Sequence, residues 1–362
     1  MRDAKNHSWL WQVVMALCPV STTAAPLDAL LNADEFFSAG EVRLEASKDA
    51  VNDKLDILKI RSSDPIYGGT NVGDYSGSHI KIAYAVTDRL LAEGSVWQRS
   101  ITYRSDEASL NSWQLAGQYR FFGEVNSPIQ IAVRFSSWGD QTNSMTKSSP
   151  TDVGGRQVTN VTIQSLSDTQ NQLDLIGTWH LSSQTSISSF IGTGSSQVST
   201  GDMTANYTSG NGCNYLLSFT KSGTSGDRTG TCASSGPILD TFSSPQNVLP
   251  DFSYGADYVQ FGGMLHWRND NWSLKGGYQF QKIKRSHVDE LIVASGGTAY
   301  DINHIFVGEL MRRLGQNSAV VVRGQLMSNQ FVGEVPFVYN QITANKFNKQ
   351  YGFLSFGLVF GF

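Results

Sequence analysis

The segment Tyr351-Gly-Phe-Leu-Ser-Phe-Gly-Leu-Val-Phe-Gly-Phe362 decides the fold class of this sequence. Successive side chains of a β-strand point to opposite faces. One face would then carry Gly352, Leu354, Phe356, Leu358, Phe360 and Phe362, and the other Phe353, Ser355, Gly357, Val359 and Gly361. A large apolar face opposite a mostly small one is typical of a strand that meets lipid and lines a barrel. The alternative is a core strand of a soluble β-sandwich.

This segment resembles the C-terminal strand of bacterial outer-membrane β-barrel proteins, which end on phenylalanine. The resemblance implies that Phe362 belongs to the signal read by the barrel-assembly machinery, and that the protein lies in the lipid of the cell outer membrane. An export signal is the second specific motif. Elsewhere the chain is similar to this class only in its pattern of alternating polarity.

Composition narrows the protein class. The chain has 362 residues, of which 40% are hydrophobic, and a formal net charge of −4. No apolar run of about 18 residues or more follows the N-terminus, which excludes a helical membrane protein. The small net charge predicts neither nucleic-acid binding nor electrostatic binding to a membrane surface.

The first residues read as an export signal. Arg2 and Lys5 precede the apolar run Trp9–Cys18, and small residues follow it. We predict a signal peptide over residues 1–24, with cleavage after Ala24. Cys18 raises the alternative of a lipoprotein, although no small residue directly precedes it.

Residues 25–40 form a predicted N-terminal periplasmic segment. Leu27, Leu30, Leu31 and Phe37 stand at helical spacing after Pro26, which suits a first helical turn. A helix here would plug the barrel lumen or dock onto a partner. The alternative is a short ordered tail.

Cys213 and Cys232 are the cysteines that remain in the mature chain, and an exported pair predicts a disulfide. They lie in a long Gly/Ser/Thr-rich stretch, residues 197–253, which is too long for a simple connection. Asn214–Thr220 between them has β character. Either an extracellular hairpin or a loop folded into the pore mouth fits this pattern.

The remaining residues, 41–362, predict an all-β, antiparallel, up-and-down transmembrane barrel. About twelve segments alternate in polarity over the length a spanning strand needs. They cover residues 42–50, 79–87, 90–103, 113–121, 129–135, 173–181, 186–195, 259–267, 272–280, 304–313, 319–327 and 351–362. Ten or fourteen strands are the alternatives, since residues 157–166 and 214–233 could extend strands or add a hairpin.

The predicted connections alternate in length. Short turns fall near residues 88, 125, 183, 269 and 316, and longer connections near 51–77, 137–170, 197–253, 285–301 and 329–349, with a shorter link at 105–110. Short periplasmic turns and long extracellular loops are typical of outer-membrane barrels. An even strand number places both chain ends at the periplasmic side.

The inward faces of these strands carry the candidate pore-lining residues. They are Arg43, Lys81, Glu93, Arg99, Arg120, Arg134, Lys275, Glu309, Arg313 and Arg323, with Glu45, Asp174, His180 and His266 in the same set. Basic residues predominate in it, which would favour anions in a water-filled lumen. Alternatively, these charges pair with one another and close the interior.

No enzyme, cofactor or metal site is predicted. Ser286-His287 lies beside Asp289, but neighbours in sequence do not make a catalytic triad. No His/Cys cluster has the spacing of metal ligands, and no glycine-rich segment has the context of a phosphate loop.

We therefore expect a monomeric, porin-like channel for passive diffusion of small polar solutes, including anionic ones. Its size and charge are similar to those of monomeric narrow-channel porins that carry acidic sugars. The alternatives are a barrel that displays its loops to partners without conducting and, less expected, a surface lipase or protease.

Overall fold

The computed structural model describes most of the predicted barrel. The described residues are 30–34, 38–51, 74–103, 106–124, 127–153, 156–210, 212–220, 222–232, 241–244, 252–294, 296–328, 336, 339 and 351–361. The predicted signal peptide (residues 1–24) and Phe362 lie outside them.

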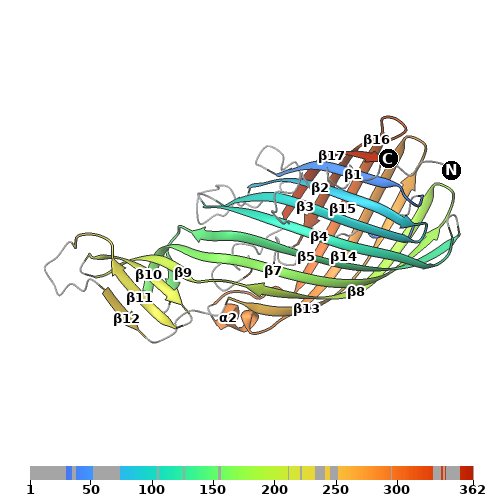
Figure 1. Cartoon of the computed structure of the whole chain (residues 1–362). Helices are drawn as coiled ribbons and strands as arrows, with labels where there is room; N and C mark the ends of the chain where they lie inside the picture. Colours follow the sequence, from blue (N-terminus) through green and yellow to red (C-terminus); the bar gives the residue numbers. More distant parts are fainter. Residues whose placement is uncertain are drawn as a thin grey trace, which may run out of the picture.

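Among the described residues, twelve antiparallel strands form a closed barrel (Figure 1). They are β1 (Val42–Val51), β2 (Asp74–Thr87), β3 (Leu90–Tyr103), β4 (Asp106–Phe122), β5 (Ile129–Lys147), β7 (Arg156–His180), β8 (Thr185–Ser199), β13 (Tyr254–Arg268), β14 (Trp272–Arg285), β15 (Ile302–Arg313), β16 (Ser318–Met327) and β17 (Tyr351–Gly361). The circle closes because β1 pairs with both β2 and β17. The predicted all-β, twelve-stranded barrel is confirmed.

One end of the barrel carries the short connections. The predicted turns near residues 88, 183, 269 and 316 join neighbouring strands there, and the Gly361 amide donates to the Asn317 carbonyl at 3.0 Å, which places the end of β17 at the same level. We call this the periplasmic end, following the usual asymmetry of outer-membrane barrels.

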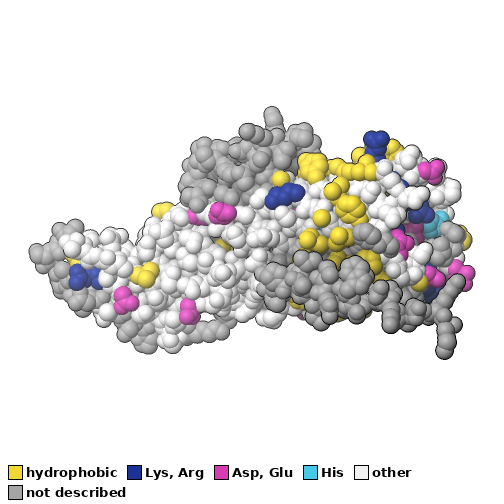
Figure 2. All heavy atoms as spheres, turned by 45° about the horizontal axis from the view of Figure 1, so that its top comes forward, with side chains coloured by type: hydrophobic (Ala, Val, Ile, Leu, Met, Phe, Trp, Pro, Cys, Tyr) yellow, Lys and Arg dark blue, Asp and Glu magenta, His cyan; other side chains and the backbone are white. Residues whose placement is uncertain are grey.

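The outer surface is an apolar belt. Side chains such as Ile80, Leu115, Leu175, Phe261 and Phe356 are each about half exposed, and at least one neighbour of each along the strand is buried. Hydrophobic side chains gather on the barrel in Figure 2, whereas the part that projects beyond it is mostly polar. Exposed Ile187 and Ile191 show which face of β8 is outward, which its sequence had not revealed. A closed barrel with this outer face is a transmembrane β-barrel.

Two strands are much longer than predicted. β5 continues to Lys147 and β7 begins at Arg156, so the loop expected at residues 137–170 is wrong. The pairing runs on to Lys147 opposite Val161, and polar side chains on both faces hid it from a search for alternating polarity. The link expected at 105–110 is also mostly strand, because β4 starts at Asp106.

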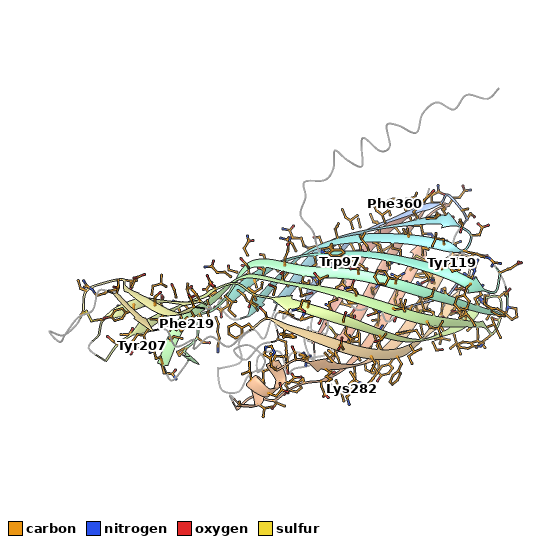
Figure 3. All side chains as sticks on the ribbon, turned by 60° about the horizontal axis from the view of Figure 1, so that its bottom comes forward. Trp97, Tyr119, Tyr207, Phe219, Lys282 and Phe360 are labelled. Atoms are coloured by element: carbon orange, nitrogen blue, oxygen red, sulfur yellow. A yellow bond between two sulfur atoms is a disulfide. The ribbon has the colours of Figure 1, made fainter. Side chains whose placement is uncertain are left out.

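Four short strands extend this hairpin beyond the barrel into a projecting sheet. They are β9 (Met203–Thr208), β10 (Asn214–Thr220), β11 (Gly223–Arg228) and β12 (Thr241–Ser244), and β9 pairs with the outer part of β7. Met203, Leu217 and Phe219 are buried in it, and Figure 3 shows Tyr207 and Phe219 far from Phe360. A further short strand, β6 (Thr151–Val153), pairs with β7. Residues 157–166 thus extend a strand and 214–228 form a hairpin outside the circle, so the count stays at twelve.

Cys213 and Cys232 form the predicted disulfide, which joins the two ends of the β10–β11 hairpin. The bond therefore staples an extracellular sheet, and these residues do not form a constriction inside the pore.

Replacing both cysteines with serine is expected to destabilise the projecting sheet by about 3 kcal/mol, since loop-closure entropy over 19 residues is lost. Limited proteolysis should then cut between residues 203 and 244 faster than in the wild type. The barrel strands should keep their resistance, because they do not depend on this bond. Equal cleavage rates for both proteins would contradict the assignment.

Helical structure is minor. Among the described residues, α2 (Val288–Ala294) lies in the connection between β14 and β15, with Val288 and Ile292 buried. Across all the residues that the structure describes, no helix is long and apolar enough to cross a membrane. Of the two alternatives for the N-terminal segment, the helix does not hold for residues 30–34, which contain turns and no helical residue; Leu27 and Phe37 lie outside the described residues.

Candidate functional site: the barrel interior

The inward faces of the strands are predominantly polar at mid-depth. Buried side chains there include Ser95, Ser112, Gln118, Ser136, Gln172, Gln260, Gln279 and Gln325. A polar interior behind an apolar outer face is the inside-out arrangement of channel-forming barrels. Toward the projecting sheet the interior becomes more apolar, with Trp97, Trp138 and Tyr258 buried.

Most of the predicted charged residues form ion pairs with one another around the inner wall of the barrel. We call this row of paired charges the belt. Glu93 lies between two cations: Lys81 Nζ is 2.6 Å from Glu93 Oε1, and Arg134 Nη1 contacts Glu93 Oε2. The Glu93 side chain is only 7% exposed. This carboxylate therefore neutralises two cations from neighbouring parts of the wall, on β2 and β5.

The belt continues on β14, β15, β16 and β1. Glu309 is 3.4 Å from Lys275 and 2.6 Å from Arg323, and Arg323 also lies 3.5 Å from Glu45. Glu45 in turn contacts His79, at 3.2 Å. Positive and negative charges thus alternate around the wall from β14 to β2, reaching across β17 through small inward residues.

On the opposite wall, glutamine side chains form hydrogen bonds with Asp174 and with one another. The Asp174 carboxylate accepts hydrogen bonds from Gln172 and Gln260, both at 2.7 Å, and Gln279 donates to Gln260. Gly192 stands opposite Asp174 in the strand register and leaves the space that this carboxylate occupies. Asp174 is therefore a fixed acceptor within a hydrogen-bonded layer.

Two predicted arginines lie away from the belt. Arg99 pairs with Asp140 at 3.1 Å, and both side chains are fully buried in the outer half of the interior. Arg120 lies near the periplasmic turns, where its guanidinium donates to the Asp88 carbonyl at 2.6 Å. Neither is placed to attract solutes into the lumen.

The inward faces carry more acidic residues than predicted from the sequence. Asp49, Asp140 and Asp168 are buried there, whereas Arg285 and Arg268 are the cations added to the set, so the excess of basic residues is smaller than the predicted set implied. Asp140 and Asp168 were missed because they fall in the segment expected to be a loop. Asp49 could have been found, since it shares a face of β1 with Arg43 and Glu45.

The N-terminal segment, residues 30–34, lies inside the periplasmic end of the barrel. The side-chain oxygen of Asn32 accepts hydrogen bonds from Thr178 at 2.9 Å and Ser188 at 3.3 Å, and its carbonyl accepts one from Gln118 at 2.8 Å. Asp34 lies 3.5 Å from His180. Asn32 is only 3% exposed, so this segment is bound by wall residues from three strands.

Apolar contacts also hold this segment. Leu31 and Ala33 are buried in a cluster with Ala132, Ile176 and Phe190, which point inward from β5, β7 and β8. These wall residues interrupt an otherwise largely polar interior, and a second small apolar cluster near this end consists of Ala83, Ala85 and Leu91. The patch of Ala132, Ile176 and Phe190 matches the two apolar side chains of the segment.

α2 lies in the connection that joins the extracellular ends of β14 and β15. Arg285 at the end of β14 contacts Asp289 at 3.2 Å and lies 4.1 Å from the centre of the Tyr339 ring. Burial raises the pKa of Asp289 above its ordinary value, and it raises the pKa of Tyr339 to about 12. These contacts fix the β14–β15 connection against the rim.

Three arginines stand at the periplasmic rim. Arg43, Arg268 and Arg313 continue the inward faces of β1, β13 and β15, and all three are exposed. Arg43 pairs with Glu41 at 3.4 Å. His266, from the predicted set, lies just inside and contacts Ser273 at 2.9 Å.

Comparisons with known proteins give matches to solved structures at low similarity. No protein-family description matches the sequence, and no curated protein matches it significantly. The translocator domain of autotransporter NalP from Neisseria meningitidis has a TM-score of 0.47 and 11% identity, over 91% of this chain and 90% of that one. The toluene transporter TodX of Pseudomonas putida has a TM-score of 0.42 and 9% identity, over 94% of each chain. The NanC porin has a TM-score of 0.41 and 7% identity, over 89% of this chain and 99% of that one. At this distance neither cargo nor mode of action transfers to this protein.

Proposed function

We propose that this outer-membrane barrel is a channel for passive diffusion of small polar solutes, narrowed at its periplasmic end by residues 30–34. The observation that carries the proposal is the polar interior behind an apolar outer belt. Serine, glutamine and paired charges on that face bind water well, and water-filled barrels conduct small polar solutes.

The charge arrangement favours weak selectivity. Each belt cation has a carboxylate within 3.5 Å, so the fields of the pairs largely cancel at the distance of a passing solute. The exposed rim arginines are different, because Arg268 and Arg313 form no ion pair with any described residue. A slight preference for anions is therefore expected to arise at the periplasmic rim.

Single-channel recording in planar bilayers tests this function. Refolded mature protein under a salt gradient is expected to give discrete current steps with a weakly anion-selective reversal potential. A strongly anion-selective reversal potential would contradict the paired belt. A folded barrel that gives no steps, even after removal of residues 25–40, would overturn the channel proposal.

A second candidate function is suggested by the projecting sheet. It is stapled by Cys213–Cys232, and its buried Leu217 and Phe219 belong to an apolar cluster that continues into the barrel, which a loop without a role would not require. A non-conducting barrel that presents this sheet to a partner would be silent in bilayers. Deleting residues 203–244 would then abolish binding to cells or surfaces and leave the barrel folded.

A further inference from the structure

The periplasmic rim contains a cavity of about 120 Å³ that opens between β13, β14, β15 and β1. Four cationic side chains line it: Arg43, Arg268, Lys275 and Arg313. Lys275 is committed to Glu309, at 3.4 Å, and Arg43 lies beside Glu41. Arg268 and Arg313 are exposed and make no ion pair with described residues, so their guanidiniums face the cavity with uncompensated charge.

Further hydrogen-bonding groups complete the lining. His266 and Ser273 contact each other at 2.9 Å on neighbouring strands, and both reach the cavity wall. Asn32 and Asp34 contribute from the N-terminal segment. Asp34 is the single carboxylate in this lining, against four cations, and it already lies 3.5 Å from His180.

The size of the cavity limits its ligand. A water molecule takes about 30 Å³ in the liquid, so this space suits a group such as a carboxylate or phosphate, not a whole metabolite. A second hollow of about 440 Å³ adjoins it and shares Arg43, Met311 and Arg313. Ala319, Val359 and Gly361 form part of its wall, and Glu41 contributes a carboxylate to it. Its volume lies in the usual range of small-molecule sites.

We propose that this rim cavity is a binding site for the carboxylate or phosphate group of a small organic anion, with the body of the molecule in the adjoining hollow. Guanidinium groups bind such oxyanions through paired N–H donors. The site adds a ligand class to the proposed channel. It does not depend on conduction, because a non-conducting barrel would keep the same cavity.

Calorimetric titration of the refolded mature protein in a zwitterionic detergent, at constant ionic strength, tests the site. Inorganic phosphate and succinate are the two probes, and glycerol is the neutral control. Both anions are expected to bind with dissociation constants on the order of a millimolar or tighter. Phosphate binding alone would assign the site to phosphate esters, and succinate binding alone to carboxylates.

Matched arginine variants distinguish anion binding in the rim cavity from a nonspecific effect of net charge. The double variant Arg268→Gln/Arg313→Gln is expected to weaken binding about tenfold or more. Arg313→Lys should keep most of it. Arg312→Gln removes the same charge from the adjacent outward face, where Arg312 lies 5.1 Å from the Trp272 ring, and should leave binding unchanged.

The proposal is overturned if neither anion binds to the folded wild type, or if Arg312→Gln weakens binding as much as Arg268→Gln/Arg313→Gln does. Bilayer currents without anion binding would refute the site and leave the channel. Anion binding without bilayer currents would support the site and refute the channel.

Discussion

Replacing Glu93 with alanine is expected to lower the free energy of unfolding of the barrel by about 3–5 kcal/mol. Lys81 and Arg134 would lose their shared carboxylate inside the wall, where Arg134 is 5% exposed and Lys81 is 29% exposed. Removing one partner of a buried ion pair leaves an uncompensated charge, which costs far more than the pair itself contributes. Urea unfolding in lipid vesicles, followed by tryptophan fluorescence, measures the change.

Glu124→Ala is the matched control for this variant. Glu124 also pairs with an arginine, Arg89 at 3.7 Å, but its side chain is 84% exposed in a periplasmic connection. Exposed pairs contribute about 0–1 kcal/mol, so this variant should unfold close to the wild type. Similar losses of stability in both variants would mean that the belt is as well hydrated as the surface.

Deleting residues 25–40 is expected to raise the single-channel conductance several-fold. The deletion removes the segment that Gln118, Thr178 and Ser188 bind inside the periplasmic end. Currents through the deletion variant and the mature chain, compared at the same voltage and salt, provide the measurement. Unchanged conductance would show that the solute path avoids this segment.

A point variant tests the same contact with less disturbance. Asn32→Ala removes the acceptor used by Thr178 and Ser188, and each lost hydrogen bond is worth about 0.5–1.5 kcal/mol. Thr178 and Ser188 remain bonded to each other at 2.8 Å, so the wall should keep its structure. More frequent openings are expected in this variant. Ser38→Ala, on an exposed residue of the same segment, should behave as the wild type.

The architecture could be predicted because lipid imposes a strict pattern on each spanning strand. The faces predicted for Phe356, Leu175 and Phe261 are all confirmed, since a period of two leaves no freedom once a strand is long enough. Outside the bilayer that constraint disappears. The outer parts of β5 and β7 carry polar residues on both faces and therefore looked like a loop.

The interior was harder to predict than the exterior. Alternation indicates that Glu93 and Arg134 point inward, but the contact between them depends on the register of three strands and on side-chain length. The position of Asn32 depends on contacts with distant strands, and no periodicity in residues 25–40 could reveal those contacts. The cationic cavity was also missed, because Arg268 was counted as part of a turn.

The pairing of β1 with β17 has a consequence for the time course of folding. These strands come from opposite ends of the chain, so their contact has the highest sequence separation in the molecule and closes the largest loop of chain. The barrel therefore begins as an open curved sheet, and the seam forms late. Arg323 and Glu45 lie on the two sides of β17 and meet only when all three strands are in place. This ion pair is a natural reporter of the final step, and its loss should slow closure without altering the earlier sheet.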